Sequence, residues 1–336
     1  MKLLTVTVPC YNSQDYMEKC INSLLPGGDR VEIIIIDDGS KDNTGMIADE
    51  YARKYPDIVR VIHQENGGHG EGINQGIAHA TGTYFKVVDS DDCVSGDFNA
   101  FLDELEACER QGGVDMVMTN YYYVHSDGIG DRSINFGNVL PEGRVFTWKD
   151  TKRFQIHQVI SIHSTTFRTE AMRKWEQPLP KHTFYEDNLM IAQTLPFVER
   201  MYYMNVDLYR YTIGREGQSV QRDVLKKRYA NQVLVSGRCF MTCHIDEIQE
   251  PRKKQYFKHM AFMMFAIAIS VARLNKNKES DMVLEDMWAQ CRAFDRKWAN
   301  HYRYRTVLAL LCIPGSFGRA ISNGIYALAN KVVRYN

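Results

Sequence analysis

The run over residues 31–36 constrains the fold more than any other part of the sequence. Apart from Glu32, all of its residues are β-branched and apolar. Continuous rather than alternating apolarity is typical of a strand that is buried on both faces, as in a parallel sheet covered by helices. An acidic turn with the sequence DDGS follows at residues 37–40. We therefore expect an α/β fold in which carboxylates lie at one edge of the sheet.

The first hundred residues alternate between strand and helix patterns. Short apolar runs predict further strands over residues 3–8, 58–63 and 83–88. Helices are predicted between these strands, over residues 13–25, 42–55 and 73–80. This alternation indicates a doubly wound parallel sheet, and ligands of such sheets bind at the carboxyl ends of the strands.

After residue 100 the alternation is weaker. Helices are predicted over residues 97–111 and 186–195, and strands over residues 114–124 and 158–167. From about residue 220 the pattern is helical, with helices predicted over residues 224–244, 252–275 and 282–303. We therefore predict an α/β domain over residues 1–220 and a helical region over residues 221–336.

Composition narrows the class of protein. The 41 basic residues balance the 41 acidic ones, so no net positive charge indicates binding to nucleic acid. The eight cysteines form no CxxC pair, which disfavours a zinc site and is typical of reduced thiols in a cytosolic protein. Neither a signal peptide nor a transmembrane helix is predicted. The longest apolar run, over residues 260–272, is shorter than the about 20 residues that span a bilayer, and it fits a buried core helix.

The C-terminal segment is basic, because Asp295 is the last acidic residue of the chain. A predicted helix in it carries apolar residues on one face, namely Ile321, Ile325, Leu328, Ala329 and Val332. Residues 301–336 therefore suit the surface of an anionic membrane, and they equally suit a docking site on the protein's own core. We expect a cytoplasmic chain, which the first interpretation would place peripherally on the inner face of the cell membrane.

A cluster of three carboxylates follows the strand predicted over residues 83–88. Asp89, Asp91 and Asp92 repel one another unless they are solvated or bind a cation. Mg²⁺ and Mn²⁺ prefer oxygen ligands and bridge carboxylates to the oxygens of a diphosphate. The cluster is therefore a candidate metal site, with a solvated acidic turn as the alternative. Because the DDGS turn also ends a strand, we expect the two clusters to lie close together.

Other candidate binding residues are less specific. In the DDGS turn, a carboxylate would accept hydrogen bonds from a nucleobase or ribose, or the turn would serve only as a helix cap. Tyr11, at the end of the first strand, would stack on a base or pack as an ordinary aromatic residue. Residues 66–72 form a predicted glycine-rich loop that lacks the GxGxxG spacing, and no Walker lysine follows. Its amides would approach a phosphate, or the loop would simply be flexible.

The order and spacing of these segments resemble the family 2 glycosyltransferases of the GT-A fold. The matching segments are VPCYN at residues 8–12, DDGS at 37–40, NGG through NQG at 66–76, and VDSDD at 88–92. The likeness is strong over residues 1–110 and continues loosely through residues 186–187 and 209–211 to 218–219. It implies an α/β GT-A fold, with a doubly wound mixed sheet followed by a C-terminal helical region.

The resemblance implies a role for each matching residue. Pro9, Tyr11 and Asp38 would hold the nucleobase, usually the uracil of UDP. Asp89 would contact the ribose or help to hold a metal ion, Mn²⁺ or Mg²⁺, and Asp91 would ligate that ion where it bridges the diphosphate. The implied donor-binding set is Pro9, Tyr11, Asn12, Asp38, Asn66, Gly68, Asn74, Asp89, Ser90, Gln218 and Ser219. Many members carry an arginine where this chain has Ile73, and His69 receives no role.

The resemblance also implies a reaction, the inverting transfer of a sugar from a nucleotide-sugar donor to a hydroxyl of a growing glycan or lipid-linked acceptor, in cell-surface polysaccharide biosynthesis. Asp187 would accept the proton of the attacking hydroxyl, and the metal would stabilise charge on the leaving diphosphate. Two other classes stay open. A sugar nucleotidyltransferase would favour a basic glycine-rich loop after the first strand, where this chain has Tyr11 and Asn12. A non-catalytic scaffold that binds a nucleotide sugar would not need the intact Asp91 and Asp187.

Overall fold

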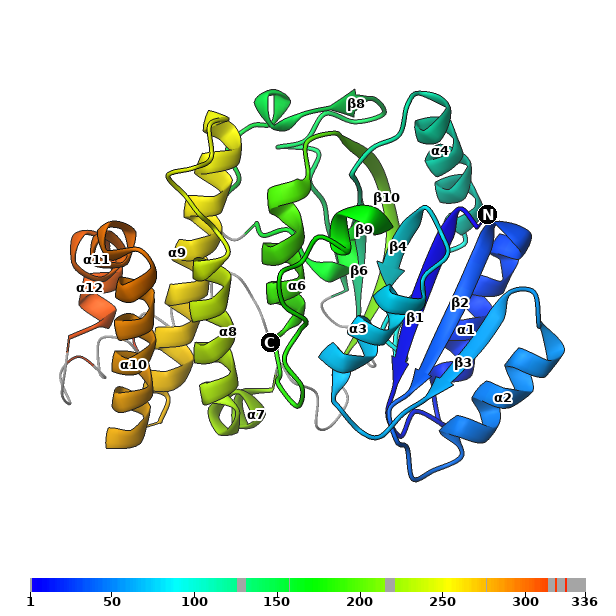
Figure 1. Cartoon of the computed structure of the whole chain (residues 1–336), viewed down its shortest axis with the longest axis horizontal. Helices are drawn as coiled ribbons and strands as arrows, with labels where there is room; N and C mark the ends of the chain where they lie inside the picture. Colours follow the sequence, from blue (N-terminus) through cyan, green and yellow to red (C-terminus); the bar gives the residue numbers. More distant parts are fainter. Residues whose placement is uncertain are drawn as a thin grey trace. The chain divides into compact units, whose positions relative to one another are not determined.

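The computed structural model describes residues 2–125, 131–156, 158–214, 221–275 and 277–313, together with residues 318 and 324. The chain divides into two compact units. The first comprises Met1–Lys152 and Ile160–Glu216, and the second comprises Arg153–Val159 and Gly217–Asn336. The first unit contains the sheet, and the second is helical in its described part (Figure 1). The expected α/β fold followed by a helical region is therefore confirmed.

The first unit is built on a mixed sheet with the strand order β3-β2-β1-β4-β9-β6-β10-β5, to which β7 and β8 add at β6 and β10. The strands are β1 (Leu4–Cys10), β2 (Val31–Asp37), β3 (Val59–His63), β4 (Tyr84–Val87), β5 (Cys93–Val94), β6 (Met116–His125), β7 (Arg132–Ile134), β8 (Val145–Phe146), β9 (Thr165–Arg168) and β10 (Met201–Ile213). The first four strands are parallel, as the sequence predicts. Because β9 runs antiparallel between β4 and β6, the whole sheet is mixed.

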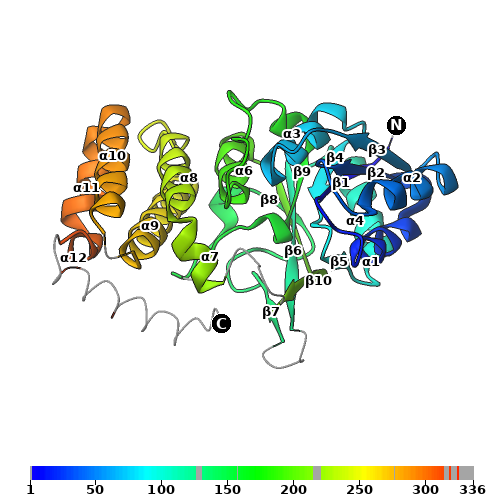
Figure 2. The same cartoon turned by 90° about the horizontal axis from the view of Figure 1, so that it is seen from below.

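Helices cover both faces of the parallel half of the sheet (Figures 1 and 2). The helices α1 (Met17–Leu24) and α4 (Phe98–Arg110) lie on one face, and α3 (His69–His79) lies on the other. Ile33 and Ile35 of β2 belong to the core under α1 and α4. Ile36, on the opposite face, lies near α3. The continuous apolarity of residues 31–36 therefore reflects burial on both faces. The remaining helices of this unit are α2 (Thr44–Lys54), α5 (Thr169–Met172) and α6 (Asp187–Thr194).

The helix α3 lies unusually close to β1 because two glycines face the strand. A Cβ atom on Gly76 would lie 2.3 Å from Thr7 Oγ1, and one on Gly72 would lie 3.1 Å from Pro9 Cβ. The expectation of a loop over residues 66–72 was wrong in its second half, since α3 begins at His69. Glycine disfavours helices, but here its small size permits the close packing. This packing sets the first turn of α3 against the carboxyl end of β1.

Two other expectations for the first unit differ from the structure. The strand predicted over residues 158–167 was wrong in its first part, because a 3-10 turn, η3 (Ile162–Ser164), precedes β9. The sequence also did not predict the thirteen-residue strand β10. Asn205 and Asp207 interrupt its apolar pattern, and its pairing with β6 shifts register between Met204 and Tyr209.

The second unit consists, in its described part, of α7 (Arg222–Lys227), α8 (Tyr229–Met241), α9 (Pro251–Arg273), α10 (Lys278–Phe294), α11 (Arg296–Arg305) and α12 (Leu308–Leu311). The single helix predicted over residues 282–303 was wrong, because the chain breaks at Asp295. That residue has extended backbone angles, and its carboxylate accepts a hydrogen bond from the Trp298 amide, which caps α11.

The apolar run over residues 260–272 lies in α9 and is mostly buried, as expected for a core helix. By length and composition the whole of α9 is also long and apolar enough to cross a bilayer, which the sequence analysis did not predict. However, 56% of its apolar window is buried inside the protein, as in the core helices of proteins that cross no membrane.

Candidate active site

The two acidic clusters meet at the carboxyl ends of β2 and β4, which flank β1 in the sheet. The turn after β1 connects them. The hydroxyl of Ser13 lies 2.8 Å from that of Ser90, and the amide of Asn12 donates to Ser40 Oγ at 3.0 Å. The predicted convergence of the clusters is therefore confirmed.

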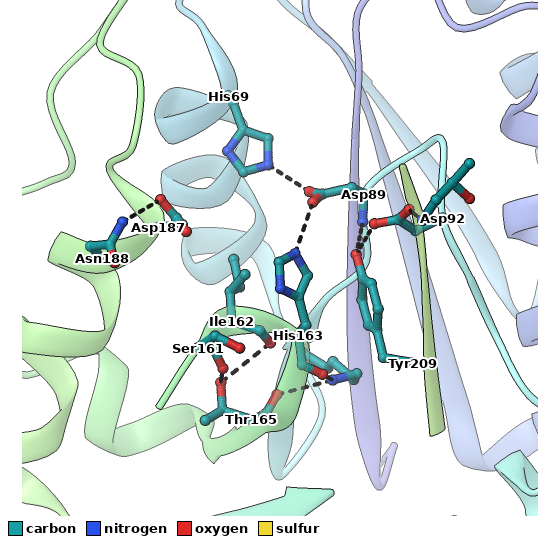
Figure 3. Close-up of polar contacts among 12 residues, drawn as sticks. His69, Asp89, Asp92, Ser161, Ile162, His163, Thr165, Asp187, Asn188 and Tyr209 are labelled. Carbon is teal, nitrogen blue, oxygen red and sulfur yellow. Dashed lines mark hydrogen bonds and ion pairs between the residues drawn. The ribbon is translucent and has the colours of Figure 1, made fainter. Parts of the chain in front are cut away.

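Asp89 lies at the centre of the site, between two histidines (Figure 3). Its Oδ1 is 2.8 Å from His69 Nε2, and its Oδ2 is 3.9 Å from His163 Nε2. Its backbone amide donates to the hydroxyl oxygen of Tyr209 at 3.1 Å. Burial by itself would raise the pKa of Asp89, but the His69 ring reverses this effect and holds the pKa below its usual value. Asp89 is therefore an ionised carboxylate at neutral pH.

Asp92 points into the protein, whereas Asp91 is partly exposed. The Asp92 carboxylate accepts hydrogen bonds from the Tyr209 hydroxyl at 2.6 Å and from the Thr212 amide at 2.7 Å. Burial, and then the negative charges of Asp89 and Asp91, raise the pKa of Asp92 well above its usual value. Asp92 thus links the strand-end turn to β10.

Asp89, Asp92 and His163 form a group whose ligand atoms all lie within 4.8 Å of one another. Burial lowers the pKa of His163 to about 4, so its ring is neutral at pH 7 and offers a lone pair. Carboxylate oxygens with one neutral imidazole are a donor set that fits a divalent ion such as Mn²⁺. The buried Lys86 fixes the turn that bears His163, since its Nζ donates to the carbonyl oxygens of His163 and Thr165, both at 3.1 Å.

Asp187 is the first residue of α6 and follows the buried Glu186. Its Oδ1 accepts a hydrogen bond from the Asn188 side chain at 3.0 Å. Burial, and then the neighbouring Glu186, raise the pKa of Asp187 to about 7. A carboxylate with such a pKa can accept and release a proton near neutral pH, which suits a general base. In Figure 3, Asp187 and Asp89 lie on either side of the His69 ring.

Asp38, a predicted nucleobase ligand, is buried and bonded within the chain. Its carboxylate accepts hydrogen bonds from the amides of Gly67 and Gly68, at 2.7 and 2.8 Å, and from Gln64 Nε2 at 2.6 Å. The Asn66 side chain donates to the Asp38 carbonyl oxygen at 2.9 Å. The Gly68 amide therefore points at Asp38 here, and the immediate role of these residues is to hold the glycine-rich segment in place.

The other predicted donor-binding residues have varied surroundings. Tyr11 is 51% exposed, as a ring that stacks on a base must be, whereas Pro9 is buried. The Asn12 side chain accepts from the Lys41 amide at 2.8 Å. Asn74 bonds to the backbone of Leu179 in both directions, at 3.0 Å each. Gln218 and Ser219 lie outside the described residues. The roles implied for this set stay predictions.

Sequence reasoning missed four residues of this site, namely His69, Glu186 as its partner, His163 and Tyr209. Each reaches the site through contacts between distant segments, such as the 117 positions that separate His69 from Glu186. A histidine between two glycines at the start of a helix was the one local signal. Nothing near His163 in the sequence indicates its position beside Asp89.

The comparisons with known proteins agree with this geometry. A family model described as Glycosyl transferase family 2 matches residues 5–174. The chain is 34% identical over 198 residues to the "Uncharacterized glycosyltransferase EpsJ" of Bacillus subtilis (strain 168), a match that covers 59% of this chain and 53% of that protein. The chain spans about half the length of the first curated relatives it matches, namely 53% of EpsJ and 42% of the "Glycosyltransferase GlyG" of Streptococcus pneumoniae.

Two solved structures have a similar architecture. S. aureus TarS 1–349 in complex with UDP-GlcNAc has a TM-score of 0.65 at 20% identity, over 99% of this chain and 92% of that one. The mannosyltransferase PcManGT from Pyrobaculum calidifontis, in complex with GDP-Man and Mn²⁺, has a TM-score of 0.52 at 15% identity. The match covers 92% of this chain and 86% of that one. At these identities the likeness supports the fold.

Proposed function

The chain belongs to the family 2 glycosyltransferases, and from this premise we propose that it transfers a sugar from UDP, or from another nucleotide diphosphate, to a hydroxyl of a growing glycan or lipid-linked acceptor. The observation that carries the proposal is that one histidine bonds the ionised Asp89 on one side and Glu186, the neighbour of Asp187, on the other, and that Asp187 has a pKa near 7. Asp187 suits a general base, and Asp89 suits a ligand of a metal ion that binds the diphosphate.

The proposed donor site lies at the carboxyl ends of β1, β2 and β4. The exposed ring of Tyr11 stacks on the base, and the turn around Asp38 borders it. Asp89 and Asp91 would hold a divalent ion at the diphosphate, and His163, whose Nε2 lies 3.9 Å from Asp89 Oδ2, would be a further ligand. When bound, such an ion supplies Lewis-acid stabilisation of the charge that grows on the leaving diphosphate.

The proposed reaction is a single displacement. The acceptor hydroxyl loses its proton to the Asp187 carboxylate as its oxygen forms the new bond to the anomeric carbon. The bond from that carbon to the diphosphate oxygen breaks, and the diphosphate leaves with the electron pair. Because the hydroxyl attacks the face opposite the leaving group, the configuration of the anomeric carbon inverts. Proton removal of this kind contributes about 10²–10⁴-fold to the rate.

A carbohydrate acceptor is supported by the aromatic rings beside the carboxylates. Tyr123 and Tyr211, on neighbouring strands, are partly exposed, and their ring centroids lie 5.5 Å apart. The His163 ring stacks on Tyr211 at 4.3 Å. Aromatic faces with polar groups at their rims suit a ligand that has both apolar faces and hydroxyls, as a sugar ring does.

The test of the function is an assay that follows nucleotide release from a UDP-sugar with Mn²⁺ and a saccharide acceptor. The plot of kcat/KM against pH is expected to rise through about 7, because Asp187 must lose its proton before it can accept one. A sugar product whose formation does not depend on pH between about 5 and 8 would contradict this role of Asp187.

We further propose that the protein is cytoplasmic and attaches peripherally to anionic membrane through residues 301–336, most of which lie outside the described residues. The support is the absence of acidic residues after Asp295 and the exposure of Tyr304 and Val307. Neutralising three basic residues of this segment should weaken co-sedimentation with phosphatidylglycerol vesicles by about 10²-fold, at about 1 kcal/mol for each charge. The residues to change to glutamine are Arg319, Lys331 and Arg334.

The matched control for this test is a variant with three exposed basic residues of the first unit changed to glutamine, namely Lys41, Arg53 and Lys54. It should sediment with the vesicles as the wild type does. Equal binding to phosphatidylcholine and phosphatidylglycerol, or equal loss in both variants, would count against the proposal.

A further inference from the structure

His69 joins two parts of the site that are far apart in the sequence. Its Nε2 lies 2.8 Å from Asp89 Oδ1, at the end of β4 (Figure 3). Its Nδ1 lies 2.8 Å from Oε1 of Glu186, the residue directly before Asp187. Both acceptors are carboxylate oxygens, so the ring donates from both nitrogens. Bonds to ionised groups are about twice as strong as bonds between neutral groups. One side chain therefore holds the two acidic segments together.

The segment before Asp187 is also bound, through its backbone, to α3 and to the turn directly before it. The amide of His182 donates to the carbonyl oxygen of Gly67 at 2.7 Å, and Leu179 exchanges two hydrogen bonds of 3.0 Å with the Asn74 side chain. Residues 179–186, named here the base loop, thus follow the first turns of α3. Two residues of the base loop, His182 and Tyr185, have φ values of 49° and 71°, which few non-glycine residues adopt. Such a backbone needs outside contacts to hold it.

The glycines on either side of His69 create the space for the base loop. A Cβ atom on Gly70 would lie 2.8 Å from Glu186 Cγ, and one on Gly68 would lie 3.0 Å from the His182 amide nitrogen. Gly68 also has a φ of 85°, which favours glycine. The glycine-rich segment is thus shaped to receive the base loop, with His69 at the point of contact.

We propose that His69 is a positioning residue, which fixes Asp187 relative to Asp89 by linking the base loop to the end of β4. The proposal rests on the proposed role of Asp187 as the base. The displacement needs the base and the leaving group on opposite sides of the anomeric carbon, and an error of about 1 Å in such a position costs about 10²-fold in rate. Because Glu186 is the N-cap residue of α6, a bond to its side chain fixes the first turn, where Asp187 lies.

The first test is the variant His69→Ala. We expect kcat to fall by about 10²-fold, because the base loop is no longer linked to the end of β4. The variants His69→Asn, which keeps a donor where Nδ1 stands, and His69→Gln, which keeps one where Nε2 stands, each retain only one end of the link. Both should lose about as much kcat as His69→Ala. The matched control is His79→Ala, at the exposed far end of α3, which should have the kcat of the wild type.

A double-mutant cycle separates a link from two independent effects. His69→Ala, Glu186→Ala and the double variant should all lose about 10²-fold in kcat, because breaking either end of one link removes it. A double variant whose loss of kcat equals the product of the two single losses would overturn the positioning role. So would a His69→Ala variant with the kcat of the wild type. If His69→Ala does not fold, His69→Asn and His69→Gln decide the question, because a wild-type kcat in either variant would overturn the positioning role. An active Asp187→Asn would instead overturn the proposed function, so the two failures are distinguishable.

Discussion

Substitution of Asp187 by asparagine is expected to lower kcat for sugar transfer by about 10²–10⁴-fold, because the amide cannot accept the hydroxyl proton. The change keeps the shape of the side chain and its bond to Asn188, in which the Asn188 side-chain Nδ2 donates to Asp187 Oδ1 at 3.0 Å. The affinity for UDP with Mn²⁺ should therefore stay near that of the wild type. Nucleotide release from a UDP-sugar, measured beside a calorimetric titration with UDP, checks both parts of the prediction.

The same variant provides a second readout that does not depend on activity. The folded pKa of Asp187 is raised to about 7, above its value of about 3.9 in an unfolded chain, so its contribution to stability is present at low pH and is lost as pH rises through 7. The variant should thus melt at a higher temperature than the wild type at pH 8, and the difference should shrink at pH 5. Wild-type transfer by Asp187→Asn would remove this residue from the mechanism.

Substitution of Asp91 by alanine is the second change with a large expected effect. If Asp91 is a ligand of the ion that binds the diphosphate, the affinity for the nucleotide would depend on that ion. The gain in UDP affinity that Mn²⁺ produces in the wild type should therefore fall by at least about tenfold in the variant. Titration with UDP, with and without Mn²⁺, measures this gain directly. The matched control, Asp57→Ala, removes an exposed carboxylate far from the site in the sequence and should keep the gain.

The structure offers a second ligand set, which this titration can distinguish from the first. Asp91 does not belong to the group formed by Asp89, Asp92 and His163. If this group holds the ion, then His163→Ala loses the Mn²⁺-dependent gain and Asp91→Ala keeps it. That outcome would contradict the role assigned to Asp91. A gain that survives in both variants would exclude both residues as ligands.

Much of the fold could be predicted because its first half is locally encoded. The run at residues 31–36 is apolar on both faces, and it forms a strand covered on both sides. The later half follows tertiary contacts instead. The strand β10 contains Asn205 and Asp207, whose side chains find partners in Asn120 and Ser133, far away in the sequence. A pattern of neighbouring residues cannot indicate partners that lie so far away in the sequence.

The same division holds for the site. Asp89 and Asp91 follow a strand in a recognisable pattern, and Asp187 was identified through its family's motif. His69 and His163 acquire their positions only when β4, α3 and η3 come together, so their neighbours in the sequence carry no sign of it. Asp38 illustrates the converse case. Its motif predicts a ligand for the nucleobase, but its carboxylate also receives two hydrogen bonds from the glycine-rich segment and one from Gln64.

The most direct test of the account is a calorimetric titration of the wild-type protein with UDP, with and without Mn²⁺. A site built from Tyr11, Asp89 and Asp91 predicts that UDP binds and that the binding requires the metal. Binding of GDP or dTDP in place of UDP would keep the site and change the donor. No binding of any of these nucleotides, with or without Mn²⁺, would contradict the claim that this chain uses a nucleotide-sugar donor.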